Sequence, residues 1–213
     1  MYLRDHKRRK VKKMILDLSE YQGVIDFNTL FKENKIDKVI LRSTKKSGLL
    51  DAKCETYFKQ IREIKGDYFP IEFYKFMYAK DAWGAYLEIE NAIQSISRGT
   101  FEDVYILWID LEQINGVEHS TKQMLDILAG AALAIVKYPS IDLGIYVNYG
   151  YLKKLPDEIK KDFPIWLARY NNVMGNIGDA NVVMWQYTSK GDLDGINGCV
   201  DISHYIEDGQ VVL

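Results

Sequence analysis

Two carboxylates, Asp110 and Glu112, stand at alternate positions at the end of the apolar run Val104–Leu111. Residues two apart on a strand point to the same face, so both side chains are expected to project together. Close like charges resist joint ionisation, which raises one pKa and keeps a proton on that group. A protonated acid beside an ionised carboxylate is the combination that cleavage of a glycosidic bond requires.

An Asp-x-Glu pair alone is a weak sign, because such pairs are common and usually lie on solvated surfaces. Here the preceding residues Tyr105–Trp108 are typical of a buried strand, which argues against a solvated edge. Asp17 and Asp201 stand in two other strand-like runs, and they strengthen the case for an acidic site.

Aromatic side chains give a second indication of sugar chemistry. The chain has 15 tyrosines and four tryptophans, and several fall near the expected strand ends. Pyranose faces stack on such rings, and a phenol also forms hydrogen bonds with hydroxyl groups. For any single ring, core packing is the simpler interpretation; as a group they favour a sugar groove. The rings are Tyr74, Tyr78, Tyr146, Trp166, Tyr170 and Tyr187.

Strand-like runs alternate with helical patterns along the chain, which predicts an α/β fold with parallel strands and right-handed crossovers. The expected strands are Met14–Leu18, Val39–Ser43, Tyr68–Tyr78, Val104–Leu111, Leu143–Asn148, Pro164–Tyr170, Val182–Tyr187 and Val200–Tyr205. The expected helices are Asp26–Asn34, Ala52–Ile64, Ala82–Ser97, Ser120–Lys137 and Tyr151–Lys161. Eight strands can close, so a TIM-like barrel with an irregular last third is predicted, with its site at the C-terminal strand ends.

The chain of 213 residues with 47% hydrophobic content suits one domain, expected over residues 14–213. Residues 1–13 form a basic arm with seven basic side chains and one acid; the remainder has 21 basic against 29 acidic residues. The arm is expected to be a solvated tail or the remnant of a longer chain, and the acidic body argues against nucleic-acid binding. No apolar stretch is long enough for a transmembrane helix, and no signal peptide is visible.

Rival chemistries have little support. The sequence lacks a GxSxG elbow and a phosphate-binding GK[ST] loop. Cys54 and Cys199 allow one isolated disulfide but no framework, and the three histidines are expected to be surface or packing residues. Asp17 with Asp201 and His204 is a weak metal pattern. We therefore expect neither a metal nor a cofactor.

Six segments in the right order resemble those of glycoside hydrolase family 25, the Chalaropsis-type lysozymes of bacteria, fungi and phages. The resemblance covers about Met14 to Tyr205, nearly the whole chain outside the basic arm. The similar segments are Ile15–Gly23, Leu41–Asp51, Tyr74–Phe76, Trp108–Glu112, Ile145–Asn148 with Trp166–Tyr170, and Met184–Gly191 continuing through Gly195–Gly198 to Asp201.

The resemblance implies a barrel of five β/α units followed by three β-strands, which agrees with the count of elements above. It also implies hydrolysis of the β-1,4 bond between N-acetylmuramic acid and N-acetylglucosamine in peptidoglycan. By position, Glu112 is the expected general acid, Asp110 its partner, and Asp17 and Asp201 complete the acidic cluster. Asp110 either orients the substrate acetamido group as an internal nucleophile or supports a direct displacement. The expected substrate-binding residues are Tyr74, Tyr78, Tyr146, Trp166, Tyr170 and Gln186.

The chain departs from the family pattern at several lysines. Lys75 stands where the family often has His, and it is expected to alter substrate contacts. Lys45 and Lys46 put positive charge into a variable loop, where they are expected to meet peptide carboxylates of the wall.

Two other functions stay open at this point. One is a non-catalytic glycan-binding module on the same barrel, and the other is a glycosidase that acts on chitin-like polymers. A monomer that acts on the extracellular cell wall is expected. It would reach the wall by phage-type release or as a fragment of a longer exported or anchored protein.

Overall fold

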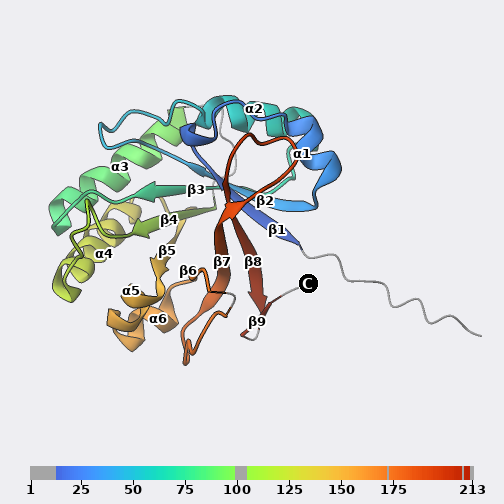
Figure 1. Cartoon of the computed structure of the whole chain (residues 1–213). Helices are drawn as coiled ribbons and strands as arrows, with labels where there is room; N and C mark the ends of the chain where they lie inside the picture. Colours follow the sequence, from blue (N-terminus) through green and yellow to red (C-terminus); the bar gives the residue numbers. More distant parts are fainter. Residues whose placement is uncertain (1–12, 99–104, 172, 208, 212–213) are drawn as a thin grey trace, which may run out of the picture.

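The computed structural model describes residues 13–98, 105–171, 173–207 and 209–211. It forms a closed barrel with helices on part of its outer face, and among the described residues no helix follows α6 (Asp157–Asp162) (Figure 1). The strands follow one another in space in chain order, and β8 pairs with β1 to close the sheet. The strands are β1 (Met14–Leu18), β2 (Ile36–Arg42), β3 (Ile71–Phe76), β4 (Ile106–Leu111), β5 (Asp142–Asn148), β6 (Ile165–Ala168), β7 (Val182–Gly191), β8 (Val200–Glu207) and β9 (Gln210–Val211). The helices are the 3-10 turn η1 (Glu20–Gln22), α1 (Phe27–Glu33), α2 (Cys54–Lys65), α3 (Ala82–Arg98), α4 (Thr121–Ile135), α5 (Tyr149–Lys154) and α6 (Asp157–Asp162).

The direction of the strands changes once. Strands β1 to β7 are joined by parallel pairings, whereas β8 runs antiparallel to both β7 and β1. The expectation of parallel strands is therefore wrong for β8. A short loop without a helix joins β7 to β8. Because so short a connection cannot carry the chain back to the other end of the barrel, β8 runs antiparallel to β7. Five β/α units followed by three barrel strands agree with the predicted architecture.

The longer helices cover part of the outer face of the barrel because they present an apolar stripe to the strands. In α3 the buried residues include Ala85, Ile89, Ile93 and Ile96, at the spacing of one helical face. Helix α4 begins with the predicted capping box, in which the Ser120 side chain accepts from the backbone of Gln123. The resulting core lies between strands and helices.

A second apolar cluster fills the interior of the barrel. It consists of Ile15, Ile40, Trp108, Tyr146, Trp166, Ala168 and Met184. Trp166 packs edge-on against Trp108 at 5.8 Å and against Tyr146 at 4.7 Å between ring centroids. This layer closes the barrel from within, so the mouth of the barrel has an apolar floor.

Several predicted elements have different bounds in the structure, and two of these differences occur at prolines. The helix expected over Tyr151–Lys161 is two short helices, because Pro156 cannot donate to a helical bond and Leu155 before it is extended (φ −71°, ψ 140°). The strand expected over Tyr68–Tyr78 begins only at Ile71, after Pro70. The short β9 was not predicted. The basic arm lies outside the described residues except for Lys13.

Both cysteines are free: Cys54 is buried and Cys199 is exposed. Burial raises the pKa of the Cys54 thiol, so this side chain is an apolar packing group and not a nucleophile. No helix in the described part of the chain has the length and apolar character needed to cross a membrane.

Gly144 on β5 is required by the packing of the barrel interior. It lies opposite Trp108 on β4, and a methyl group at this position would stand 2.4 Å from the indole ring. We expect Gly144→Ala to lower the free energy of unfolding by about 1–3 kcal/mol, as overpacked cores do. Chemical denaturation measures this loss.

The matched control is Gly84→Ala in α3, where the nearest atoms would lie at 3.3 Å. We expect a smaller change there, because alanine also favours a helix. Equal stability of Gly144→Ala and the wild type would contradict the tight packing around Trp108.

Candidate active site

The four predicted carboxylates meet at one end of the barrel, although they come from three strands. Asp17 is directly opposite Asp201 in the antiparallel pairing of β1 with β8. Asp110 lies on β4, and Glu112 follows this strand. Because β8 runs backwards, its start lies beside the C-terminal ends of the parallel strands. The reversal of β8 therefore brings Asp201 to the same end as the other three acids.

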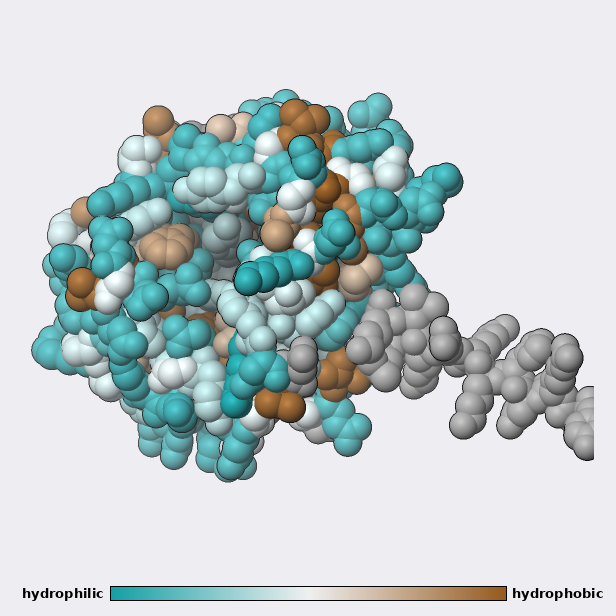
Figure 2. Space-filling model, viewed as in Figure 1, coloured by the Kyte–Doolittle hydropathy of each residue, from teal (hydrophilic) through white to brown (hydrophobic). Residues whose placement is uncertain are grey.

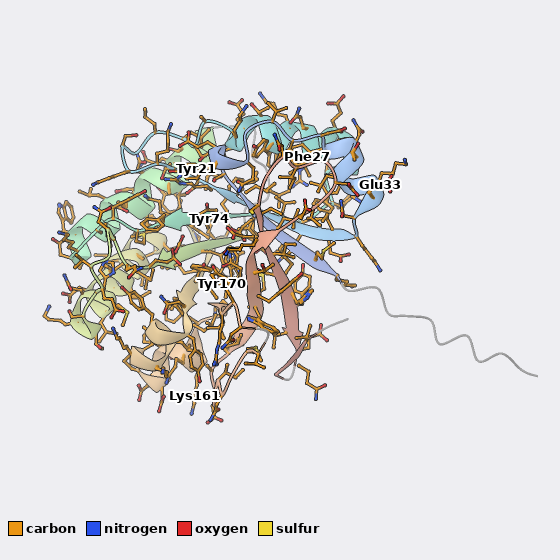
Figure 3. All side chains as sticks on the ribbon, in the orientation of Figure 1. Tyr21, Phe27, Glu33, Tyr74, Lys161 and Tyr170 are labelled. Atoms are coloured by element: carbon orange, nitrogen blue, oxygen red, sulfur yellow. The ribbon has the colours of Figure 1, made fainter. Side chains whose placement is uncertain are left out.

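A pocket of about 330 Å³ opens at this end, and it contains all ten predicted site residues. Its walls are formed by Asp17, Tyr21, Arg42, Tyr74, Phe76, Tyr78, Asp110, Glu112, Tyr146, Trp166, Tyr170, Gln186, Ser189 and Asp201. The face seen in Figure 2 is largely hydrophilic and is hollowed near its centre. Figure 3 places Tyr21, Tyr74 and Tyr170 around this central region, whereas Glu33 and Lys161 lie at the periphery.

The carboxylates differ in depth. Asp17 and Asp110 are each only 7% exposed, whereas Glu112 and Asp201 are half-buried. Burial raises the pKa of Asp17 and Asp110 well above the ordinary value, and a neighbouring carboxylate adds to it: Asp201 for the former, Glu112 for the latter. Burial also raises the pKa of Glu112 and of Asp201. The cluster therefore retains protons at a pH where isolated carboxyls have lost them.

Asp17 and Asp201 influence each other. The charge of Asp201 helps to raise the pKa of Asp17, whereas the interaction with Asp17 lowers that of Asp201 against the effect of burial. Asp110 is held differently, since its Oδ1 atom is buried without a hydrogen-bond partner. A buried carboxylate oxygen without a partner disfavours the ionised form.

Gln186 on β7 connects the acids to two phenols. Its Oε1 atom accepts hydrogen bonds from Tyr146 (2.8 Å) and Tyr170 (2.6 Å), and its Nε2 atom donates to Asp17 Oδ2 (3.0 Å). The Tyr146 hydroxyl also lies 3.3 Å from Glu112 Oε1. This hydroxyl has one proton and donates to one acceptor at a time. The bond to Gln186 is the shorter one, and donation to Glu112 favours the ionised form of Glu112.

Arg42 at the end of β2 is a pocket residue to which no role was assigned from the sequence. Its guanidinium donates to the Tyr78 hydroxyl at 3.2 Å and lies 3.9 Å from Asp51. The positive charge of Arg42 opposes the rise in the pKa of Asp110. The sequence could have indicated that Arg42 lies at the site, because it is a charged residue at the end of a buried strand. Tyr21, Phe76 and Ser189 line the pocket as well and were also missed.

Lys75, expected to alter substrate contacts, does not line the pocket. It belongs to the residues of β3 that face outward, and its ammonium lies between β3 and α3. There it donates to the backbone oxygen of Phe76 (2.8 Å) and pairs with Glu88 at 3.3 Å. Glu88 in turn accepts from the backbone N–H of Tyr78 at 3.0 Å. Lys75 and Glu88 thus hold the segment that carries Tyr78.

The predicted aromatic residues are not equally accessible. Trp166 and Tyr146 are 2% and 6% exposed, and Trp166 donates to Ser203 inside the barrel. Tyr170 is 52% exposed and Tyr21 80%. Open ring faces are therefore found at the rim of the pocket, whereas the deep rings form its floor. Tyr187, which was also considered, stacks on His204 and does not line the pocket.

No metal-binding arrangement of three or more His, Cys, Asp or Glu side chains occurs among the residues that the structure describes. His119 and His204 are buried packing residues away from the pocket, and His6 lies outside the described residues. The polar groups that line the pocket are carboxyl groups, phenols, the Arg42 guanidinium, the Gln186 amide and the Ser189 hydroxyl.

A barrel whose strand ends converge on buried carboxyl groups is the architecture of a barrel-fold glycoside hydrolase. The family model described as glycosyl hydrolases family 25 matches residues 16–196, and the chain belongs to this family.

Individual relatives agree with this assignment. The chain is 25% identical over 195 residues to the "Autolytic lysozyme" of Clostridium acetobutylicum, which covers 90% of this chain and 55% of that protein. The structure is similar to the modular autolysin LytC from Streptococcus pneumoniae (24% identity, TM-score 0.78, 91% of this chain and 46% of that one). It is also similar to the bacterial lysozyme from Streptomyces coelicolor (15% identity, TM-score 0.72, 92% and 93%). The chain spans about half the length of the first two relatives.

The raised pKa of Asp110 predicts a cost in stability. The folded state binds its proton more tightly than the unfolded state, so stability falls as the pH rises above the ordinary carboxyl value. We expect Asp110→Asn to raise the melting temperature at pH 7 by about 2–4 °C, equivalent to roughly 1 kcal/mol in a chain of this size. The gain should shrink towards zero near pH 3.

Asp26→Asn is the control, and its effect on the melting temperature should have the opposite sign. Hydrogen bonds from Thr29 lower the pKa of this exposed carboxyl. It therefore stabilises the protein above the ordinary pKa, and the contribution is lost as the pH falls through the lowered pKa. Asp26→Asn should lower the melting temperature at pH 7. A stabilisation by Asp110→Asn that does not depend on pH would contradict the electrostatic explanation.

Proposed function

We propose that this chain is a lysozyme, an N-acetylmuramidase that hydrolyses the β-1,4 bond between N-acetylmuramic acid and N-acetylglucosamine in bacterial peptidoglycan. Membership of glycosyl hydrolases family 25 and the similarity to an autolytic lysozyme support the proposal. The observation that carries it is the half-buried Glu112, held beside the deeply buried Asp110 at the mouth of the barrel.

Glu112 is the proposed general acid. Burial and the charge of Asp201 raise the pKa of its carboxyl group, against a hydrogen bond from Tyr146. A glutamic acid that keeps its proton at a pH where ordinary glutamates are ionised can give it to the leaving glycosidic oxygen. Its partial exposure allows the reacting oxygen to come within hydrogen-bond reach.

Asp110 is the proposed partner on the other side of the reacting carbon. In its ionised form, which Arg42 favours, it stabilises positive charge at the sugar carbon. Its alternative role is to orient the substrate acetamido group as an internal nucleophile. Its depth and the neighbouring Arg42 suit a fixed group that holds its position. Asp17 and Asp201 complete the cluster, and the charge of Asp201 helps to keep the proton on Glu112.

The proposed sugar contacts are divided between rim and floor. Tyr170 offers an open ring face, so it is the proposed stacking residue, with Tyr74 and Tyr78 along the wall. Tyr146, Trp166 and Gln186 form the floor, and Tyr146 and Gln186 donate hydrogen bonds to Glu112 and Asp17. The proposed form of the protein is a monomer that acts on the cell wall.

The proposal is tested by digesting purified peptidoglycan with wild-type protein and with Glu112→Gln, followed by mass spectrometry of the products. Wild type should release fragments that end in reducing N-acetylmuramic acid. Loss of the general acid should lower the rate by at least about a hundredfold. The matched control is Glu118→Gln in the same β4–α4 connection, where the carboxylate is exposed and pairs with Lys154; it should retain activity.

Three results would contradict parts of the proposal. Near-normal activity of a folded Glu112→Gln variant would overturn the assignment of the acid. Intact glycan strands with retained binding by the wild type would indicate a glycan-binding module. Faster cleavage of polymers that contain only N-acetylglucosamine would indicate a chitin-directed glycosidase.

A further inference from the structure

Tyr78, on one wall of the pocket, is surrounded by cationic side chains. Arg42 donates to its hydroxyl at 3.2 Å, and the ammonium groups of Lys75 and Lys46 lie 4.9 and 5.6 Å from its ring centroid. The carboxylates Asp17, Asp110, Glu112 and Asp201 line the same pocket. The pocket therefore combines an acidic cluster with a wall that carries positive charge.

The cations of this wall differ in how they are neutralised. Lys75 is buried and pairs with Glu88 at 3.3 Å, and Arg42 has Asp51 at 3.9 Å. Lys45, next to Lys46, pairs with Glu20 at 3.1 Å. Within the part of the chain that the structure describes, Lys46 forms no ion pair, and it is exposed. Lys46 thus offers an uncompensated charge at the mouth.

Arg42 adds a second unsatisfied group. Its side chain is 7% exposed and lines the pocket, yet its Nε atom is buried without a hydrogen-bond partner. Buried donors are normally satisfied. Because this Nε has almost no accessible surface, the contact of Arg42 with a ligand would come from its terminal nitrogens, one of which donates to the Tyr78 hydroxyl.

The loop that carries Lys46 is held in place by its own backbone. Lys45 N–H donates to Leu49 (2.8 Å), Gly48 N–H donates to Lys45 (3.0 Å), and Thr44 pairs with Leu50 in an isolated bridge. Gly48 has φ +81°, which a residue with a side chain rarely adopts. A turn fixed in this way presents Lys46 beside Tyr78 at a smaller entropic cost than a mobile loop would.

We propose that Lys46, Arg42 and the Tyr78 hydroxyl form an anion-binding subsite that takes a carboxylate of the muramyl substituent of the substrate. This inference deepens the proposed function and rests on it. A muramyl residue bears a lactyl group, which is a free carboxylate in peptide-free glycan and an amide where a stem peptide is attached. In the second case the carboxylates belong to the peptide. Both sources present the same acceptor to the subsite.

The subsite would orient the glycan along the pocket. A muramyl residue whose carboxylate lies against Lys46 places its ring on the Tyr78 side of the acids. An N-acetylglucosamine residue carries no carboxylate and therefore forms no ion pair with Lys46. Lys46 is therefore a specificity-determining residue that distinguishes the two alternating sugars by charge.

Lys46→Glu tests the subsite, with Lys32→Glu as the matched control. Lys32 is 80% exposed on α1 and does not line the pocket, so it undergoes the same charge change elsewhere. The substrates are soluble glycan strands with and without stem peptides, each also with its carboxylates converted to methylamides. The readouts are kcat and KM from new reducing ends, and the Kd for strands in the Glu112→Gln background.

We expect Lys46→Glu to raise KM and Kd about fivefold on carboxylate-bearing strands, with little change in kcat, as loss of an exposed ion pair does. The difference from wild type should disappear on methylamide strands and shrink at high salt. An effect confined to peptide-bearing strands assigns the carboxylate to the stem, and one on peptide-free strands assigns it to the lactyl group.

Equal KM and Kd for Lys46→Glu and Lys32→Glu would overturn the subsite, and so would an effect that persists on methylamide strands. Absence of new reducing ends with wild-type protein would instead overturn the proposed function. The Kd measurements do not depend on turnover, so they would still test the subsite in that case.

Discussion

Closure of the barrel by an antiparallel strand is the constraint on which the rest of the structure depends. Pairing of β8 with β1 sets Asp201 opposite Asp17, and the parallel strand β4 brings Asp110 and Glu112 to the same end. The acids are therefore close together and shielded from water by the barrel wall. Like charges that are both close and desolvated cannot all ionise at neutral pH. The fold thus creates the protonated acid that the proposed chemistry needs.

The arrangement that serves the proposed function lowers the stability of the folded protein. A buried carboxyl cluster costs folding free energy at neutral pH, because the unfolded chain solvates each group separately. The surrounding side chains offset part of this cost. Gln186 donates to Asp17 and accepts from two phenols, and the positive charge of Arg42 stabilises the ionised form of Asp110. Lys75 lies behind the wall, where it holds the segment of Tyr78. The positive charges are thus arranged around the acids without neutralising Glu112 directly.

Much of the site was predictable because each acid follows or begins an apolar run, and such runs mark buried strands. The two-residue spacing of Asp110 and Glu112 indicates by itself that both side chains lie on the same face of a strand. The direction of β8 was missed because β7 was predicted to end at Tyr187, which leaves about a dozen residues before Val200, enough for a parallel crossover. In the structure β7 continues to Gly191, and the shorter connection that remains requires an antiparallel strand. The break at Pro156 follows from proline geometry, but the helical periodicity on both sides concealed it. Arg42 was missed because a single charged residue forms no spacing pattern. Its role becomes clear only in the folded structure, where it contacts Tyr78 and Asp51 at the pocket.

The central claim is that the barrel raises the pKa of Glu112 so that the group remains protonated where ordinary glutamates are ionised. Carboxyl-carbon NMR titration of the free protein, with Glu112 assigned by comparison with Glu112→Gln, measures this directly. We predict that Glu112 titrates above the ordinary glutamate value, whereas Asp26 titrates below the ordinary aspartate value in the same sample. A Glu112 resonance that titrates at the ordinary value of about 4.3 would contradict the account.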